Sequence, residues 1–168
     1  MKLVLLAAGK SSRIYNDIGY NKCLIKIKGK TLIQHIIDNA SNCGIKDIIV
    51  VVGFNPKKIL ENLKNYKNIK FVYNKKFKTT DMVYSAFLAL KNLKSDVLIS
   101  YTDIFYDKSL FSLLKKKDFR NITIPYTKDW IKIWKLRKKN IITDAETFYK
   151  DKNNFLTEIG KKLTKKKL

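Results

Sequence analysis

The sequence predicts an α/β fold in which a mostly parallel sheet carries helices on both faces. Two observations support it. Four short apolar segments have the length and composition of strands, namely residues 2–8, 47–52, 69–73 and 96–101. Segments with helical spacing of apolar residues separate each strand from the next, and this alternation implies right-handed crossovers between parallel neighbours.

The first strand is predicted at residues 2–8 because this run is continuously apolar. The run begins like a signal peptide, but it is short and ends in a glycine and a lysine, so a strand is the better interpretation. The first helix is predicted at residues 31–42, with Thr31 as a possible N-cap and Gly44 just past its end.

The second strand ends at Gly53, and Pro56 begins a helix that we expect to continue to about residue 66. The third strand precedes a helix predicted at residues 79–93, and the fourth strand follows that helix. The inward positions of the helix at 79–93 are expected to be Met82, Ala86, Ala89, Leu90 and Leu93.

Beyond the fourth strand the pattern changes. We predict a helix at residues 109–116 and strands at 121–126 and 130–137, the last from an alternation of apolar and lysine side chains. The lysine-rich tail at 161–168 is expected to be frayed. The length fits one domain, which we place at residues 1–160.

Lysine dominates the charge of the chain. The 168 residues carry a formal net charge of +22, and the only arginines are Arg13, Arg120 and Arg137. Base reading and bidentate phosphate contacts favour arginine, and the lysines are spread over the whole chain, so we expect no specific nucleic-acid binding. A general attraction for anionic substrates is expected.

Two further absences limit the classes of function. No segment approaches the length of a membrane span, so we expect a cytoplasmic protein without membrane binding. Cys23 and Cys43 have neither C-x-x-C spacing nor a histidine nearby, so we expect buried free thiols rather than a zinc site or a disulfide.

The first strand runs directly into a small-residue loop, and cations follow it. Small residues let backbone N–H groups approach phosphate oxygens, while Arg13 and Lys22 can neutralise charge that develops when an α-phosphate is attacked. The loop lacks the first glycine of a P-loop and the G-x-G-x-x-G of a Rossmann fingerprint. An ordinary strand-to-helix turn is the alternative to a nucleotide site. The loop residues are Leu6, Ala7, Ala8, Gly9, Lys10, Ser11 and Ser12.

This order of strand, loop, arginine and lysine resembles the nucleotidyltransferases that make sugar nucleotides and CDP-alcohols. Their signature reads roughly L-A-A-G-x-G-x-R, followed by P-K; here Ser11 replaces the second glycine and Asn21 the proline. The resemblance implies a three-layer α/β/α Rossmann-like fold of the GT-A type with a mixed, mostly parallel sheet. It also implies that the loop binds the nucleotide and that Arg13 and Lys22 are catalytic.

Asp103 follows the fourth strand, at the edge of the sheet where ligands bind. Gly9, Gly53 and Asn74 follow the other three strands, so we expect all four loops to converge on one cleft. A carboxylate there can hold Mg²⁺, which bridges phosphate oxygens and offsets developing charge. The resemblance implies the same role for Asp103; the alternative is an aspartate that caps the next turn.

Thr80 and Ser85 lie at the start of the helix that precedes the fourth strand. N–H groups and hydroxyls at this position can contact a base or a ribose. The family pattern here resembles T-N-x-x-x-S, in which Asp81 replaces the asparagine, and the resemblance implies that Thr80 and Ser85 bind the nucleotide. The alternative is a simple N-cap by Thr79 or Thr80.

The prediction of the acceptor comes from two segments in the C-terminal part. A D-W…W…R pattern at 129–137 and the sequence D-A-E-T-F at 144–148 resemble the phosphocholine cytidylyltransferase-like branch, which includes enzymes that activate aminoethylphosphonate. Tryptophan faces and carboxylates can surround an ammonium group; alternatively, the tryptophans anchor a core or an interface. The resemblance implies an acceptor site at Tyr126, Asp129, Trp130, Trp134, Asp144 and Glu146.

The sequence thus predicts a Mg²⁺-dependent enzyme that transfers a nucleotidyl group to a small phosphate or phosphonate such as phosphocholine. CTP is the favoured donor, and pyrophosphate is released. A sugar 1-phosphate acceptor is the main alternative within the enzyme class. Family members usually continue well beyond the D-A-E segment, so a non-catalytic nucleotide-binding remnant is a second alternative. A basic RNA-binding protein is a third.

Overall fold

The structure is a computed structural model that describes residues 1–116, 121–137 and 145–162, without the side chains of residues 12–14 and 137. The chain divides into two compact units, Met1–Asp118 and Phe119–Leu168. Across the described ranges, no helix has the length and apolar character needed to cross a membrane.

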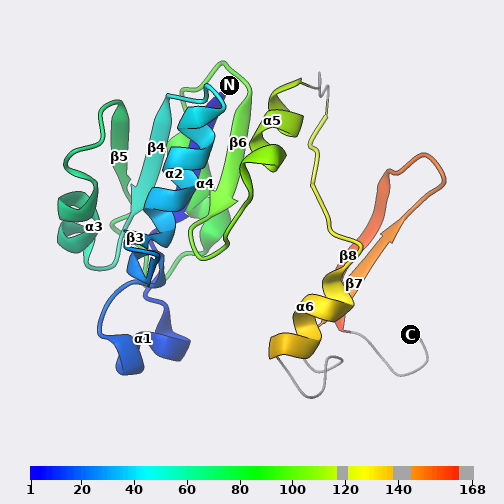
Figure 1. The fold of residues 1–168 in the computed structure, drawn as a ribbon, viewed down its shortest axis with the longest axis horizontal. Coiled ribbons are helices and arrows are strands. Elements are labelled where there is room, and N and C mark those ends of the chain that lie inside the picture. The colour runs from blue at the N-terminus through cyan, green and yellow to red at the C-terminus, as the bar shows by residue number, and fades with distance from the viewer. Residues whose placement is uncertain (117–120, 138–144, 163–168) are drawn as a thin grey trace. The chain divides into compact units, whose positions relative to one another are not determined.

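The first unit is built on a four-stranded parallel sheet with the order β5-β4-β1-β6 (Figure 1). The register aligns the carboxyl ends of the strands: Val52 pairs with Ala7 and with Tyr73, and Leu6 pairs with Tyr101. The loops that follow the strands therefore begin at one edge of the sheet. All four predicted strands are present, as β1 (Lys2–Ala7), β4 (Ile48–Val52), β5 (Ile69–Tyr73) and β6 (Val97–Tyr101).

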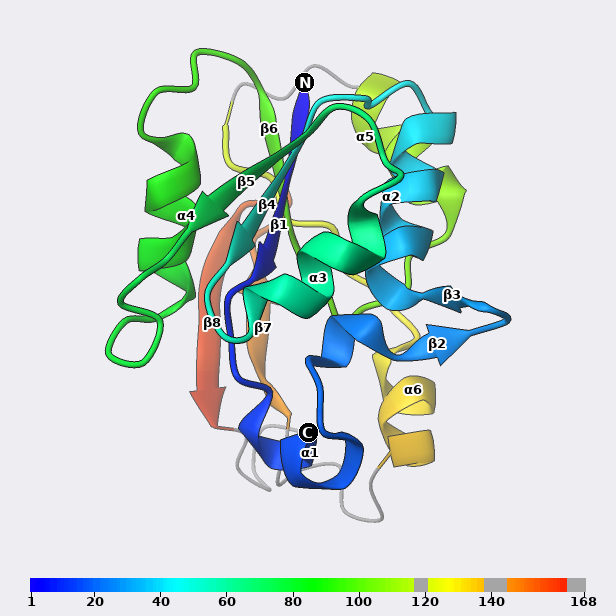
Figure 2. The ribbon, with the colours of Figure 1, turned by 90° about the vertical axis from the view of Figure 1, so that its left-hand side faces the viewer.

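Helices cover both faces of this sheet (Figure 2). On one face lie α2 (Leu32–Asn42), α3 (Pro56–Leu63) and α5 (Lys108–Lys116), and on the other lies α4 (Met82–Leu90). Helices on both faces of a parallel sheet confirm the predicted three-layer α/β/α arrangement.

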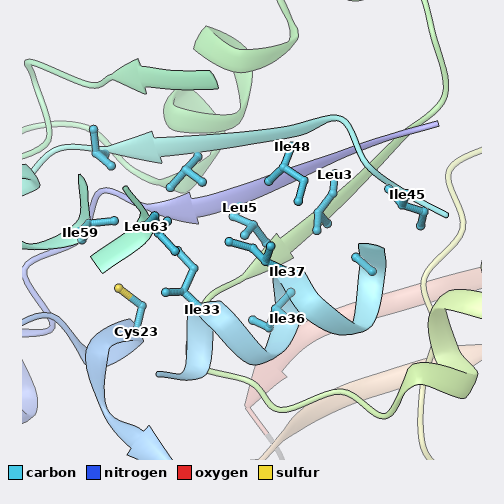
Figure 3. Close-up of a cluster of buried hydrophobic side chains, with 14 of the residues drawn as sticks. Leu3, Leu5, Cys23, Ile33, Ile36, Ile37, Ile45, Ile48, Ile59 and Leu63 are labelled. Carbon is cyan, nitrogen blue, oxygen red and sulfur yellow. The ribbon is translucent and has the colours of Figure 1, made fainter. Parts of the chain in front are cut away.

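The larger hydrophobic core lies between the sheet and α2 (Figure 3). Leu3 and Leu5 of β1 and Ile33 of α2 are all fully buried there. Val4 belongs to a second cluster with Ala89 of α4 on the opposite face. β1 is therefore buried on both faces, as its continuous apolar sequence predicts, and each fully buried leucine contributes about 1.5–3 kcal/mol.

Several short elements between β1 and α2 have no counterpart in the sequence prediction. The first of them is the helix α1 (Ser12–Ile18), which ends at Gly19; this glycine has a left-handed conformation with a φ of 68°. The helix α1 begins inside the predicted small-residue loop, and a single 3-10 turn, η1, leads into an antiparallel hairpin. Their bounds are α1 (Ser12–Ile18), η1 (Lys22–Leu24), β2 (Lys26–Ile27) and β3 (Lys30–Thr31).

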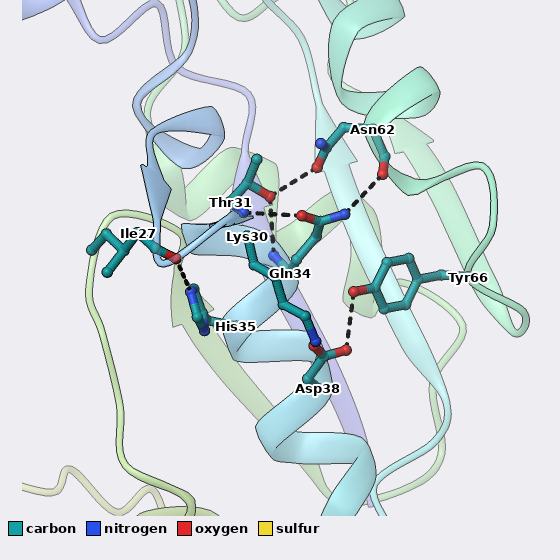
Figure 4. Close-up of polar contacts among 8 residues, drawn as sticks. All are labelled: Ile27, Lys30, Thr31, Gln34, His35, Asp38, Asn62 and Tyr66. Atoms are coloured by element: carbon teal, nitrogen blue, oxygen red, sulfur yellow. Dashed lines mark hydrogen bonds and ion pairs between the residues drawn. The ribbon is translucent and has the colours of Figure 1, made fainter.

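Polar contacts hold this hairpin against α2 and α3 (Figure 4). Thr31 forms a capping box with Gln34, in which the Thr31 N–H donates to Gln34 Oε1 at 2.9 Å. The buried Thr31 hydroxyl also donates to Asn62 Oδ1 of α3 at 2.9 Å. His35 Nε2 lies 2.8 Å from the carbonyl oxygen of Ile27 in β2. These contacts fix the hairpin, and with it the η1 turn that precedes it.

Two predicted helices are shorter than expected. α3 ends at Leu63 rather than near residue 66, and α4 begins only after Asp81. Asp81 is the N-cap, since its carboxylate accepts a hydrogen bond from the Tyr84 N–H at 3.0 Å, so Thr79 and Thr80 are not the cap. Met82 is 50% exposed, which corrects the expectation that it faces inward.

Met82 stands outside the core because it is the first residue after the cap, and its sulfur accepts a hydrogen bond from the Tyr101 hydroxyl at the end of β6. Ala89 of the same helix is buried as expected.

The second unit differs most from the prediction. Residues 130–137 form the helix α6 (Trp130–Arg137) instead of a strand. The alternation of apolar and lysine side chains suggests a strand, but Trp130 and Trp134 are four residues apart, which places them on the same face of a helix. Residues 121–126 form no strand, since no described segment pairs with them. A hairpin follows α6, made of β7 (Glu146–Lys150) and β8 (Leu156–Lys162), and β8 includes the first two residues of the predicted tail.

We predict that Gly53→Ala destabilises the protein by about 1–3 kcal/mol because the added methyl group overpacks its site. A Cβ at Gly53 would lie 2.7 Å from Phe77 Cβ and 2.9 Å from the Ala8 carbonyl oxygen, and the latter is backbone that cannot turn away. Urea unfolding measures the change.

Gly9→Ala is the matched control, since a Cβ there meets no atom within 4 Å and its φ is not in the left-handed region. It should change the free energy of unfolding by no more than about 0.5 kcal/mol. Equal destabilisation by the two variants would contradict the packing argument.

Candidate active site

A pocket of about 160 Å³ lies at the carboxyl edge of the first unit's sheet. The loop after β1, the η1 turn and the end of β6 contribute to its lining. Six residues of the predicted site thus come together, whereas Gly53 and Asn74 follow their strands at the same edge without lining this pocket. The lining residues are Leu6, Ala7, Gly9, Ser11, Asn21, Lys22, Cys23, Tyr101, Thr102 and Asp103.

Ser11 has the backbone conformation that glycine prefers, with a φ of 58°. Its carbonyl oxygen accepts a hydrogen bond from the Tyr15 N–H at 3.0 Å in the first turn of α1. Its hydroxyl accepts a hydrogen bond from the Lys22 N–H at 3.2 Å. Serine at the glycine position of the signature therefore keeps the turn and adds a bond to the segment that carries Lys22.

Lys22 and Asp103 face each other in the pocket. Lys22 Nζ lies 3.4 Å from Asp103 Oδ2, and the two side chains are 29% and 43% exposed. An ion pair with this exposure contributes only about 0–1 kcal/mol, so the two groups can separate cheaply when a ligand enters. Among the described residues, the hydrogen bond to the Asp103 carboxylate comes from Lys22 and not from the backbone of a following turn.

Asp103 provides a single carboxylate for a metal ion. No group of three or more histidine, cysteine, aspartate or glutamate side chains with metal-binding geometry occurs in the described ranges. Mg²⁺ keeps several waters and is commonly held by one or two carboxylates together with substrate phosphates. The donor set therefore fits a Mg²⁺ ion that enters with a nucleotide, rather than an ion held by protein ligands alone.

Lys10 lies over aromatic rings at the mouth of the loop. Its Nζ is 5.8 Å from the centre of the Tyr15 ring and 6.0 Å from that of Phe54. The two rings meet edge to face at 5.0 Å. Phe54 is also tied to the loop, because its N–H donates to the carbonyl oxygen of the buried Ala8 at 3.0 Å. Tyr15 and Phe54 belong to no recognisable motif, so no signal in the sequence marks them as part of the site.

Ser12 and Arg13 belong to the first turn of α1, and their side chains lie outside the described part of the structure. The catalytic role of Arg13 therefore stays a prediction from the sequence.

Thr80 and Ser85 belong to a hydrogen-bonded group around Asn74, which directly follows β5. The Asn74 amide donates to both hydroxyls at 3.0 Å, and Asn74 is 1% exposed. The hydroxyls in turn donate to backbone carbonyl oxygens, Thr80 to Lys76 at 2.8 Å and Ser85 to Asp81 at 3.3 Å. This group joins the loop after β5 to the start of α4. Binding of a nucleotide by Thr80 and Ser85 stays a prediction.

The predicted acceptor residues belong to the second unit. Trp130 and Trp134 meet edge to face on α6, with ring centroids 6.4 Å apart. Asp129 pairs with Lys132 at 2.9 Å. The Tyr126 ring lies 5.1 Å from the Phe148 ring of β7.

The two acidic residues of the D-A-E segment differ in what the structure shows of them. Glu146 is an exposed residue at the start of β7, and Asp144 lies outside the described residues.

Cys23 lines the pocket but is 3% exposed, which confirms the expectation of a buried free thiol for this residue, whereas Cys43 is free but only half-buried. Burial raises the pKa of this thiol to about 12, against the smaller opposing effects of hydrogen bonds with its own backbone and with Thr102. The thiol is therefore neutral at physiological pH and does not serve as a nucleophile.

A larger pocket of about 440 Å³ lies at the other end of the strands, beside α4. Its lining includes Lys2 and Asp47, which stand at the amino ends of β1 and β4, and none of the predicted site residues. Ligands of parallel α/β sheets bind at the carboxyl edge, so the smaller pocket is the better candidate.

Asn21 also lines the pocket, although it is not among the site residues predicted from the sequence. It is 2% exposed, and its amide donates to the carbonyl oxygens of Gly9 and Phe54. The one signal in the sequence was that it stands where the signature has proline.

Comparison with known proteins adds family information. The model of the MobA-like NTP transferase domain matches residues 3–152. The CTP:phosphoglutamine cytidylyltransferase of Campylobacter jejuni is 34% identical, over 96% of this chain and 66% of that protein. The choline-phosphate cytidylyltransferase of Streptococcus pneumoniae is 28% identical, over 87% of this chain and 65% of that protein. The chain thus spans slightly less than two thirds of the length of these two relatives.

Solved structures show the same fold. A nucleotidyl transferase from Methanothermobacter superposes with a TM-score of 0.58 at 21% identity, over 67% of this chain and 55% of the other. The CTP:phosphocholine cytidylyltransferase from Streptococcus pneumoniae superposes with a TM-score of 0.54 at 24% identity, over 64% of this chain and 49% of the other.

We predict that Cys23 resists alkylation in the folded protein. At pH 8, a pKa of about 12 in place of the ordinary 9.0 lowers the thiolate fraction about 1,000-fold, and the thiolate is the reactive form. The test uses a Cys43→Ser variant, in which Cys23 is the only thiol, and follows iodoacetamide labelling by mass spectrometry. Labelling should become rapid in urea; equally fast labelling of folded and unfolded protein would contradict the prediction.

Proposed function

The chain belongs to the MobA-like NTP transferase domain family, and from this premise we propose that it transfers a nucleotidyl group from a nucleoside triphosphate to a small phosphorylated acceptor. The observation that carries the proposal is the meeting of Lys22 and Asp103 in a pocket whose other side is the small-residue loop after β1. A cation, a carboxylate and exposed backbone N–H groups are the parts that phosphoryl transfer requires.

In the proposed reaction an oxygen of the acceptor phosphate attacks the α-phosphorus of the triphosphate. The bond from the α-phosphorus to the bridging oxygen breaks, and pyrophosphate leaves with that electron pair. No general base is needed, because the attacking oxygen is already anionic. The protein's task is to hold the two reactants in line and to stabilise the charge that develops.

The loop after β1, Lys22 and Asp103 each have a part in this scheme. The loop from Leu6 to Ser12 positions the triphosphate through its backbone. Lys22, with Arg13 as its proposed partner, offsets the charge on the α-phosphate. Asp103 would hold Mg²⁺, which would supply positive charge to offset the charge on the phosphate oxygens. The weak ion pair between Lys22 and Asp103 leaves both groups free to turn to the ligand.

CTP is the proposed donor and a nitrogen-containing phosphate the proposed acceptor. Two relatives are named as cytidylyltransferases, one of phosphoglutamine and one of choline phosphate. The adjacent Trp130 and Trp134 rings offer π faces to a cationic or polar nitrogen group.

Two other functions remain as alternatives. A protein that binds a nucleotide without catalysis would release no pyrophosphate. An RNA-binding protein would have an affinity for RNA that falls steeply with salt concentration and does not depend on Asp103.

We predict Mg²⁺-dependent pyrophosphate release with CTP and one phosphorylated acceptor. The assay compares CTP, UTP, ATP and GTP, each with phosphocholine, phosphoglutamine, aminoethylphosphonate and a sugar 1-phosphate. Asp103→Asn should lower the rate at least about 100-fold, since it removes the charge that holds the metal.

Asp47→Asn is the matched control for the loss of one acidic charge, because Asp47 is exposed at the opposite end of the strands. It should keep full activity. If protein shown to be folded releases no pyrophosphate with any pair of nucleotide and acceptor, the proposed enzymatic function is rejected and a binding protein is favoured.

We predict that Trp130→Ala and Trp134→Ala each raise the KM for an ammonium-bearing acceptor by about 5–30-fold, the loss expected for a cation–π contact. The KM for CTP should stay within about twofold. Phe155→Ala, which removes an aromatic ring that is 62% exposed in the β7–β8 hairpin, is the control. A loss of the same size with a sugar 1-phosphate would indicate a structural role for the tryptophans.

A further inference from the structure

We propose that Asn21 is a positioning residue that clamps two loops together and thereby sets the place of Lys22. This inference rests on the proposed function, in which Lys22 stabilises charge on the transferred phosphate. Asn21 itself contacts none of the reacting atoms in the scheme above. It acts through the backbone of the loop after β1 and through the residue that follows it in the chain.

The side-chain amide of Asn21 joins segments that are far apart in the sequence. Its Nδ2 donates to the carbonyl oxygen of Gly9 at 3.4 Å and to that of Phe54 at 3.1 Å. Gly9 belongs to the loop after β1, and Phe54 to the loop after β4. One amide therefore connects three segments at the carboxyl edge of the sheet.

The two carbonyl oxygens fix the orientation of this amide. If the amide were turned over, Oδ1 would face both carbonyl oxygens, and acceptor would meet acceptor. In the present orientation Oδ1 is buried without a partner among the described residues. A buried acceptor without a partner is unfavourable, so maximal stability alone does not favour asparagine at this position.

The backbone at Asn21 favours the same conclusion. Its φ of −64° is one that proline also adopts, so asparagine keeps the backbone conformation of the signature's proline and adds a side chain that can bridge. Asn21 is the N-cap residue of the η1 turn, and its carbonyl oxygen accepts a hydrogen bond from the Leu24 N–H at 2.9 Å. Movement of Asn21 would therefore move the whole turn.

Lys22 is consequently held from two sides. Its N–H donates to the Ser11 hydroxyl at 3.2 Å, and the preceding residue is fixed by Gly9 and Phe54. With its backbone held in this way, the flexible side chain extends to 3.4 Å from Asp103. Loss of the clamp should loosen the η1 turn and spread the positions of Lys22 Nζ, while the core stays intact.

The test compares Asn21→Leu with Asn39→Leu. Leucine has the same branching and the same number of side-chain heavy atoms as asparagine, so the change removes the amide and also the unpartnered Oδ1. Asn39 is a half-buried residue of α2 whose amide donates to the Tyr106 carbonyl oxygen at 2.8 Å, away from the pocket. Asn21→Ala repeats the test without a branched side chain, should the leucine variant fail to fold.

Two readouts are taken on the full chain. The first is hydrogen exchange of the Lys22 amide without any nucleotide, which does not depend on the proposed activity. Asn21→Leu should speed this exchange at least about tenfold, the value expected from the loss of about one buried hydrogen bond, and Asn39→Leu should leave it unchanged. The second readout is kcat and KM for pyrophosphate release. Asn21→Leu should lower kcat at least about tenfold and change the KM for the nucleotide less than about twofold.

Unchanged Lys22 exchange in the Asn21 variants would overturn the clamp. Faster exchange with unchanged kcat would overturn its part in positioning. If the unsubstituted protein releases no pyrophosphate with any substrate pair, the proposed function fails, and the exchange measurement still decides whether Asn21 holds the Lys22 turn. Equal losses in the Asn21 and Asn39 variants would show a general loss of packing and overturn the proposal.

Discussion

β1 lies between β4 and β6 and is buried on both faces, and the rest of the first unit depends on this placement. Leu3 and Leu5 belong to the core beneath α2, while Val4 belongs to the core beneath α4. The parallel register on both sides of β1 brings the ends of the strands to one edge. The loop after β1 therefore stands next to the end of β6, where Asp103 follows, although the two segments are far apart in the chain.

Apolar burial places the strands, but directional bonds place the loops. The hydroxyls of Ser11 and Thr31 and the amide of Asn21 each connect segments that are separated in the sequence. A hydrogen bond of this kind contributes only about 0.5–1.5 kcal/mol net, yet it selects one loop conformation among many. Such bonds surround the η1 turn, so Lys22 is the point at which the hairpin, the loop after β1 and the end of β6 come together.

A net charge of +22 attracts anionic ligands generally, but it does not align them. The first unit contains the described residues of the predicted nucleotide site, while the predicted acceptor residues belong to the second. The predicted nucleotide residues thus follow strands of a sheet whose two central strands, β1 and β4, are mostly buried, whereas Trp130, Trp134 and Glu146 belong to a short helix and a hairpin with many exposed apolar side chains.

The sequence by itself determined the four parallel strands, α2, α5, the start of α3 and the residues that follow the strands, because apolar periodicity and turn residues act locally. It did not decide residues 130–137, where alternation and a four-residue spacing of Trp130 and Trp134 coexist, or residues 121–126, because a strand also needs a neighbour. Only the tertiary structure showed that Ser11 and Asn21, noted in the sequence as departures from a motif, bond to distant backbone groups. Partners of that kind are set by how the chain folds, and no local pattern encodes them.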